Sequence, residues 1–315
     1  MNYQEKSWFS IVFDWKSSVI PNIWLRVLVI MIFAFGVTIA HGNNLPMSQP
    51  ILGSIIPGIV LGLLLVFRTN TAYDRYWEGR KLIGLIAQTS RSMAKNMIVF
   101  IPEHNSEDYG KKISHVKLLI ALFISIKYQL RQETVNQEIK SFISEIQYLE
   151  LISAKNMPLK IMKWLTIYFD ELTKNKTINE LTLITWNKEI EEIFIHFGGC
   201  ERIASTPIPQ AYSIHLKHLL LLYCFAIPFQ FVAELSWWTI PVAGIISFAL
   251  LGVEAIGLEI ENPFGYDYND LPLDEIATRM TEDIQELIDS GSFNNSELWE
   301  GWLTTPLAEA KGILS

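Results

Sequence analysis

The chain has 315 residues; half of them are hydrophobic, 18% are charged, and the mean hydropathy is +0.24. Soluble domains usually carry about a quarter charged residues, so this composition argues against an ordinary soluble protein. The net charge of −8 excludes a basic nucleic-acid-binding surface. Only two cysteines are present, Cys200 and Cys224. They form no disulfide framework, and we expect two buried thiols.

Four apolar runs have the length of a membrane-spanning helix, about 17–25 residues. They cover residues 23–40, 51–67, 216–233 and 237–258. Four spans place both chain ends on one side of the membrane. The sequence therefore predicts a multi-pass membrane protein.

Charged residues indicate which side this is. The connection between the first two spans carries no Lys, Arg, Asp or Glu, and the turn between the last two carries one acid. The other side receives five basic residues: Lys16, Arg68, Arg75, Arg80 and Lys81. Because basic residues stay on the cytoplasmic side, we expect cytoplasmic N- and C-termini.

The polar regions, residues 68–212 and 259–315, are too long for simple loops. Apolar residues recur at helical spacing in four segments: Val116–Leu130, Ile139–Leu151, Leu159–Leu172 and Leu181–Phe197. Pro158 marks a helix start, and the pair Gly198–Gly199 is expected to follow a helix end. The run at 118–126 is too short to span a membrane and is expected to be a core helix. The predicted fold class is all-α, a single unit over residues 1–315 in which membrane helices continue into a cytosolic helical bundle.

The second span contains two parallel stripes. Small residues recur at every fourth position (Ser54, Gly58, Gly62), which lets helices approach closely in lipid. An apolar stripe lies one residue further on (Ile51, Ile55, Ile59, Leu63, Phe67). A helix of this kind can pack on one stripe and present the other elsewhere. Beyond it, Arg68, Asp74, Arg75 and Glu78 have the i, i+3 and i, i+4 spacings of local ion pairs.

Three long motifs resemble a known family. They are LGLLLVFRTNTAYDRYWEGRKLIG at residues 61–84, CERIASTPIP at 200–209 and IENPFGYDYNDLPLD at 260–274. In type and in order they resemble bestrophins, most closely the bestrophin-like channels of bacteria and chloroplasts. The resemblance implies a homopentamer in membrane lipid with one axial pore.

The resemblance also assigns pore residues. It places Ile55, Ile59 and Leu63 in a hydrophobic neck, and the neighbouring stripe of Ile56, Val60 and Leu64 is the alternative register. Animal bestrophins have phenylalanines in the neck, whereas this chain has aliphatic residues. Ile208, between two prolines, is implied to form a second, cytosolic aperture; a kinked connector is the alternative.

The third motif carries six oxygen-bearing residues: Glu259, Glu261, Asn262, Asp267, Asp270 and Asp274. Animal bestrophins bind Ca²⁺ in the corresponding region with an Asn and consecutive acids, but here the acidic run is interrupted by Tyr268 and Asn269. We expect helix capping and solvated acids, with a calcium site at Asn262, Asp267 and Asp270 as the alternative. No other metal or cofactor is expected.

The resulting hypothesis is a passive channel for chloride or other anions, in a bacterial inner membrane or a chloroplast thylakoid-type membrane. The first alternative is a cation-selective homologue that conducts sodium. The second is a membrane-anchored signalling scaffold or enzyme that uses the cytosolic helices. An enzyme is disfavoured because the sequence shows no clustered nucleophile, base or metal ligands.

Overall fold

The computed structural model describes residues 9–10, 14–15, 17–49 and 55–290. Within these residues the secondary structure is helical with no β-strand, which confirms the all-α expectation. The chain divides into two compact units. Unit 1 comprises Met1–Arg80 and Arg202–Leu271, and unit 2 comprises Lys81–Glu201 and Pro272–Ser315. Residues 50–54 of the second expected span and 291–315 of the expected cytosolic region lie outside the described residues.

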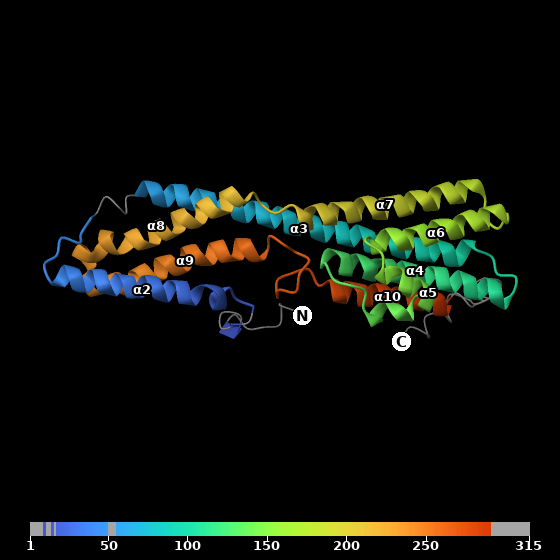
Figure 1. Ribbon diagram of the computed structural model, residues 1–315, viewed down its shortest axis with the longest axis horizontal. Helices are drawn as coiled ribbons and strands as arrows, with labels where there is room; N and C mark the ends of the chain where they lie inside the picture. The colour runs from blue at the N-terminus through green and yellow to red at the C-terminus, as the bar shows by residue number, and fades with distance from the viewer. Residues whose placement is uncertain (1–8, 11–13, 16, 50–54, 291–315) are drawn as a thin grey trace, which may run out of the picture. The chain divides into compact units, whose positions relative to one another are not determined.

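Unit 1 contains three of the expected membrane helices. They are α2 (Ile20–Gly42), α8 (Gln210–Leu235) and α9 (Thr239–Glu259). Figure 1 shows these three helices side by side, as their mutual contacts require. The segments Ile20–Gly42 and Gln210–Glu259 are long and apolar enough to cross a membrane, which matches the runs at 23–40, 216–233 and 237–258.

A tight reversal joins α8 to α9. The 3₁₀ turn η4 (Ser236–Trp238) begins at Ser236, whose φ of 49° is left-handed. A left-handed residue at this position ends the α8 hydrogen-bond ladder at once. Two antiparallel helices therefore follow each other with almost no loop.

Small residues and aliphatic side chains hold the three helices together. A Cβ atom on Gly244 of α9 would lie 2.9 Å from the Met31 sulfur of α2, so a larger residue there would force the Met31 side chain to shift. The buried core of the bundle comes from all three helices: Ile23, Ile30, Ala34, Cys224, Ile227, Ala243, Leu251 and Ala255. Cys200 and Cys224 are both buried and are not joined in a disulfide, as expected.

Helix α3 (Ile55–Phe100) is one uninterrupted helix of 46 residues that contributes to both units. Its first turns carry the described part of the second expected span. The helix then continues through the polar sequence, and Gly79 and Gly84 do not end it. Leu61 and Leu65 are buried against Leu216 and Leu220 of α8, which attaches this part of α3 to unit 1.

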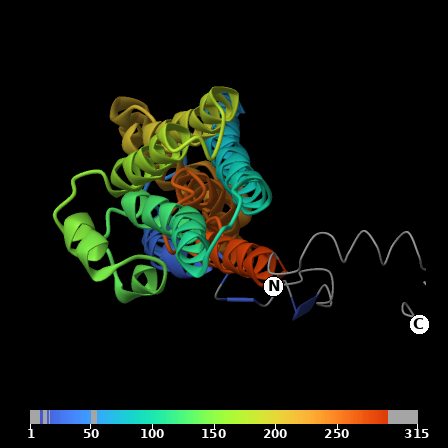
Figure 2. The same ribbon diagram turned by 90° about the vertical axis from the view of Figure 1, so that its right-hand side faces the viewer.

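Unit 2 is a bundle of shorter helices. It contains the second part of α3 and most of α7, together with five further elements: α4 (Ser106–Leu130), η3 (Gln137–Ser141), α5 (Glu145–Ile152), α6 (Met157–Lys174) and α10 (Leu273–Ser290). Helix α4 packs against α6 and α10, and Figure 2 shows this group end-on. Side chains fix several starts: Asn105 caps α4, Ser144 and Gln147 form a capping box on α5, and Pro158 stands in the first turn of α6.

Helix α4 is the core helix of unit 2. By length and composition alone this segment could cross a membrane, but 72% of its apolar window is buried inside the chain. The sequence reading limited the apolar run to nine residues and excluded a span on that ground. The helix itself has 25 residues, so burial is the better reason to treat it as a core element.

Two expectations about helix ends in unit 2 are wrong. The segment 139–151 is divided between η3 and α5, because Ser144 caps a new helix there. Gly198 and Gly199 do not end a helix: α7 (Glu180–Ser205) continues through them. A Cβ on Gly199 would lie 2.8 Å from Leu82 Cδ1. This glycine therefore serves close packing of α7 on α3.

A buried lysine ties α4 to its neighbours. Lys127 Nζ donates to Glu138 at 2.8 Å and to Asp274 at 2.9 Å, and Arg131 donates to the same Asp274 at 2.9 Å. Burial raises the pKa of the Asp274 carboxyl, but the hydrogen bonds and charges of Lys127 and Arg131 outweigh this effect and hold the pKa below its ordinary value of 3.8. The ionised form of Asp274 is thus stabilised by folding.

Replacing Asp274 with Asn should lower the free energy of unfolding by about 1 kcal/mol at neutral pH. The effect stays small because the Asp274 side chain is 60% exposed and water screens the pair. A depressed folded-state pKa gives stability above the unfolded-state pKa, and this stability is lost as the pH falls through the folded-state pKa. The difference in Tm between wild type and Asp274→Asn should therefore shrink as the pH falls below about 4. Thermal unfolding followed at several pH values checks this; a constant difference would contradict it.

Candidate functional site

One face of α3 in unit 1 is apolar and uncovered. Ile59, Leu63 and Phe67 are 62%, 54% and 57% exposed. They are three described members of the apolar stripe read from the sequence. Ile55 lies at the first described position of α3, and its side chain is not described. No element among the described residues of the single chain therefore covers these three side chains.

The alternative register is less exposed. Val60 is 48% exposed, but Leu64 packs partly against the core that joins α3 to α8. The Leu64 carbonyl also accepts a hydrogen bond from the Tyr212 hydroxyl at 2.7 Å. The side of α3 that carries Leu64 is thus turned toward its own chain.

Of the two described glycines in the small-residue stripe of α3, one packs against another helix of the same chain. A Cβ on Gly58 would lie 2.9 Å from the Tyr223 hydroxyl of α8, whereas a Cβ on Gly62 would meet nothing within 4 Å. Gly58 therefore serves packing inside the chain. The space beside Gly62 is open in the single chain.

The segment between α7 and α8 is held by Arg75 of α3. Its Nε donates to the Glu261 carbonyl at 3.1 Å, and its two terminal nitrogens donate to the Thr206 and Ile203 carbonyls at 2.6 and 2.7 Å. The end of a helix leaves carbonyls without intrahelical donors. The planar guanidinium satisfies these groups from one rigid fork. We call this contact the Arg75 clamp.

Glu261 connects the same segment to a second arginine. One carboxylate oxygen accepts the backbone N–H of Ile208 at 2.9 Å, and the other lies 3.4 Å from Arg68 Nη2. Arg68 is only 2% exposed. The local ion pairs expected within residues 68–78 are therefore wrong: Arg68 and Arg75 bind Glu261, and Glu78 lies 3.2 Å from Arg202.

Ile208 itself lies against its own chain. Its residue is 9% exposed, and it lines a cavity of about 350 Å³ together with Phe67, Arg68, Thr71, Pro209 and Tyr212. The backbone at this position is restrained by the flanking prolines and by Glu261. The structure thus brings the expected aperture residue next to the helix that carries the expected neck.

The third motif forms a turn after α9. Asp270 accepts the backbone N–H of Asp267 at 2.8 Å, and the Leu271 N–H donates to the Pro263 carbonyl at 2.9 Å. Asn262 and Asp267 are exposed. Among the described residues, no group of three or more His, Cys, Asp and Glu side chains could hold a metal ion. The calcium alternative at Asn262, Asp267 and Asp270 stays a prediction.

Sequence reasoning missed a buried acid in α9. Glu254 is 1% exposed, and its Oε2 lies 3.9 Å from Arg26 Nη1 of α2. The signal was present, since Glu254 is a charge inside an apolar run, and intramembrane charges are rare and usually paired.

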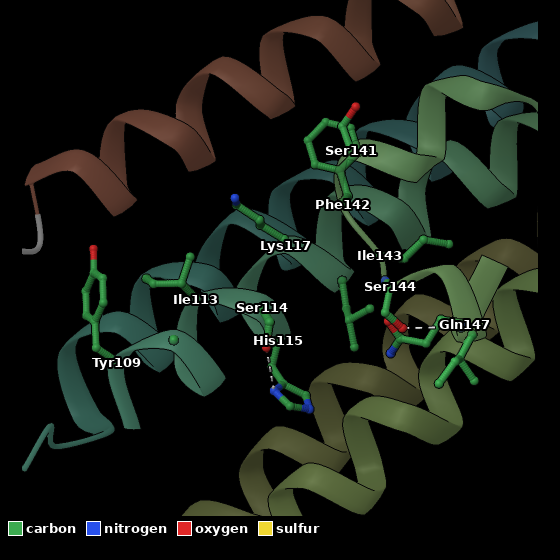
Figure 3. Close-up of a pocket in the computed structure, with 13 residues that line it drawn as sticks. Tyr109, Ile113, Ser114, His115, Lys117, Ser141, Phe142, Ile143, Ser144 and Gln147 are labelled. Atoms are coloured by element: carbon green, nitrogen blue, oxygen red, sulfur yellow. Dashed lines mark hydrogen bonds between the residues drawn. The ribbon is translucent and has the colours of Figure 1, made fainter. Parts of the chain in front are cut away.

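A cavity of about 640 Å³ in unit 2 offers no catalytic pair (Figure 3). It lies between α4 and the η3–α5 segment. Among its lining residues, Ser114 and His115 most resemble a catalytic nucleophile and its base. The two are 3.4 Å apart, but His115 Nδ1 lies 2.7 Å from the Lys111 carbonyl and must carry the proton that it donates there. Nδ1 therefore cannot accept a proton from Ser114. The ring also stacks on Tyr168 at 3.6 Å, and burial lowers its pKa, which indicates a structural histidine.

Comparison with known proteins gives a consistent result. A family model described as Bacterial/Fungal Bestrophin protein matches residues 1–286. A voltage-dependent anion channel-forming protein of Nostoc sp. is 48% identical over 91% of this chain and 94% of its own length. A protein of the same name from Synechocystis sp. is 45% identical over 89% and 92%. The Escherichia coli K12 protein of that name is 29% identical over 90% and 93%.

Solved structures show the same fold. The crystal structure of a bacterial bestrophin homologue from Klebsiella pneumoniae matches with a TM-score of 0.77. The match covers 85% of this chain and 98% of that one, at 24% sequence identity. This likeness concerns the fold alone.

Replacing Arg75 with Gln should release the segment that it clamps. Three hydrogen bonds from a charged donor are lost, and we expect the free energy of unfolding to fall by about 3 kcal/mol. Amide hydrogen exchange within residues 203–209 should accelerate accordingly. Arg80→Gln is the matched control, because Arg80 is exposed on the same helix. Equal exchange in the two variants would contradict the clamp.

Proposed function

Because this chain belongs to the bacterial/fungal bestrophin family, we propose that it is a passive anion channel with one axial pore. The observation that carries the proposal is the uncovered apolar face of α3. Its residues Ile59 and Leu63 are more than half exposed in the single chain, in a membrane protein whose relatives bear the name of anion channel-forming proteins. A ring of copies gives this face a place at a central axis.

The ring is a homopentamer in lipid, as in the family that the sequence motifs resemble. The open space beside Gly62 permits a neighbouring helix to approach α3. Five copies of Ile55, Ile59 and Leu63 then form the neck. Such a hydrophobic constriction gates by dewetting, because an ion must lose water there and finds no polar group to replace it.

Ile208 forms the cytosolic aperture in this proposal. Support comes from the restraint on its backbone, since Pro207, Pro209 and the Glu261 carboxylate fix the segment against α3. A restrained segment presents five equivalent side chains at one depth. A small difference in width or polarity at this ring then changes which hydrated ions pass.

The distribution of basic residues supports the orientation. We propose that both termini and unit 2 are cytoplasmic, with the spans in a bacterial inner membrane or a chloroplast thylakoid-type membrane. Calcium has no part in this mechanism. Conduction measured with and without a calcium chelator tests the calcium alternative directly.

Two alternatives remain as proposals of lower rank. An aliphatic neck does not by itself choose the sign of the ion, so a sodium-conducting homologue has the same neck. A scaffold or enzyme in unit 2 is disfavoured by the Ser114–His115 geometry. The ion that carries current distinguishes the first alternative, and any current at all distinguishes the second.

The purified protein should be a pentamer by native mass spectrometry and should conduct chloride in liposomes. In a sodium chloride gradient the reversal potential should lie near the chloride equilibrium potential. A reversal potential near that of sodium would select the cation alternative. A pentamer without ion flux, or a monomer in mild detergent, would contradict the channel proposal.

Replacing Ile59 with Ala should widen and wet the neck and raise the current several-fold. Ile32→Ala on α2 is a matched control, because Ile32 is also 62% exposed in the single chain. The control should leave the current unchanged. Planar-bilayer recordings at equal protein density provide the comparison, and equal currents would move the pore to a different face of α3.

Replacing Ile208 with Thr should change the relative permeability of anions, or of chloride and sodium, more than the size of the current. Threonine adds a hydroxyl that can donate to an anion or accept from water. Ile195→Thr on α7 is the control for an exposed isoleucine in unit 2. Unchanged reversal potentials in a conducting Ile208→Thr pentamer would remove the selecting role of this residue.

A further inference from the structure

Arg68 carries a buried positive charge that is only partly compensated. Its side chain is 1% exposed, and its contact with Glu261 is long, 3.4 Å from Nη2 to Oε2. Its Nε and Nη1 have no hydrogen-bond partner among the residues that the structure describes. A buried donor without a partner costs about 1–3 kcal/mol, and more when the group is charged. The guanidinium therefore favours a further acceptor.

Glu261 cannot fully neutralise this charge. Its Oε1 accepts the Ile208 N–H at 2.9 Å, so the carboxylate is shared between a backbone donor and the guanidinium. The aliphatic stem of Arg68 lies against Gly257 of α9, where a Cβ would be 3.8 Å from Arg68 Cδ. The charge is thus held in place from two sides.

The cavity of about 350 Å³ that Arg68 lines is otherwise apolar or occupied in its hydrogen bonds. Phe67, Ile208 and Pro209 supply apolar surface. The Thr71 hydroxyl donates to the Phe67 carbonyl at 2.9 Å, and the Tyr212 hydroxyl donates to the Leu64 carbonyl at 2.7 Å. No acidic side chain is among the lining residues. Arg68 is therefore the cationic group of this cavity. Its uncommitted donors, Nε and Nη1, are themselves buried, so an anion in the cavity reaches them only when neighbouring side chains shift.

We propose that this cavity is a binding site for a small monovalent anion, held by Nε and Nη1 of Arg68. The apolar walls favour weakly hydrated anions, such as bromide or nitrate, over strongly hydrated ones, because entry costs the ion its water. The charge-assisted hydrogen bonds of the guanidinium offset this cost. The choice of ligand rests on the proposed function, in which such anions are present in the pore.

The site adjoins both the expected neck helix and the expected aperture. Phe67 follows Leu63 by one helical turn, and Ile208 lines the cavity directly. An anion on Arg68 would compete with Glu261 for the guanidinium, and Glu261 holds the Ile208 N–H. Occupancy of the site is thereby linked to the position of the aperture segment.

The test is bromide binding to the full-length pentamer. Crystals grown in sodium bromide should show an anomalous bromide peak at hydrogen-bond distance from Arg68 Nε or Nη1. The Tm of the protein should be higher in sodium bromide than in sodium gluconate at equal ionic strength, because a bound ligand stabilises the folded state. An ordered water or empty density in the cavity, with bromide present elsewhere in the crystal, would overturn the proposal.

Two variants sharpen the result. Arg68→Gln should lose both the bromide peak and the Tm difference, whereas Arg202→Gln, which changes an arginine with a 70% exposed side chain, should keep them. If Arg68→Gln does not fold, the wild-type anomalous map decides alone. Bromide at Arg68 without anion flux in liposomes would support the anion site and reject the channel proposal. Anion flux without bromide at Arg68 would support the channel proposal and reject the anion site.

Discussion

The guanidinium of Arg75 donates to three backbone carbonyls that come from two segments far apart in the sequence, the end of α7 and the turn after α9. These carbonyls have no helical donor, and the chain on either side of them contains prolines that cannot donate. Without the clamp, the Ile203–Ile208 segment would lose its attachment to the same α3 face that packs on α8. The positions of Glu261, Arg68 and Ile208 all depend on this one contact, because Glu261 supplies a carbonyl to Arg75 and its carboxylate to the other two.

A second constraint follows from the surface of α3. Helix α3 packs on one side through Leu61 and Leu65 and exposes Ile59 and Leu63 on another side. Its backbone hydrogen bonds are made within the helix, but its apolar stripe has no partner among the described residues of the single chain. In lipid such a stripe carries little penalty, and close packing decides whether helices associate. The two glycines of α3 differ in what lies beside them. Tyr223 of the same chain packs against Gly58, whereas the space beside Gly62 is open in the single chain.

Buried charge is treated differently in the two units. In unit 2 the buried Lys127 is surrounded by two carboxylates and lies within hydrogen-bond distance of both, so its charge is fully compensated. In unit 1 the buried Arg68 shares one carboxylate with a backbone N–H, and Glu254 has one arginine at 3.9 Å. A buried charge with close partners avoids the cost of burial without compensation, whereas a partly compensated charge in an apolar surrounding retains affinity for an ion. This difference is the physical basis for treating the unit 1 arginine as a binding group.

The sequence by itself determined the all-α class, three membrane helices and the starts of α6 and α7 to within two residues, because apolar periodicity and Pro158 act within a few residues. It also identified the motifs that place the chain in its family. The tertiary structure decided the partners of the charges. Arg75 and Glu78 have the i, i+3 spacing of a local ion pair, yet Arg75 donates to backbone carbonyls and Glu78 lies beside Arg202, while Arg68 contacts Glu261. A solvated ion pair one turn away stabilises little. It likewise decided that Gly199 lies inside α7. A glycine ends a helix or admits a neighbour depending on what packs there, and Leu82 is 117 positions away from Gly199 in the sequence, beyond the reach of any local pattern.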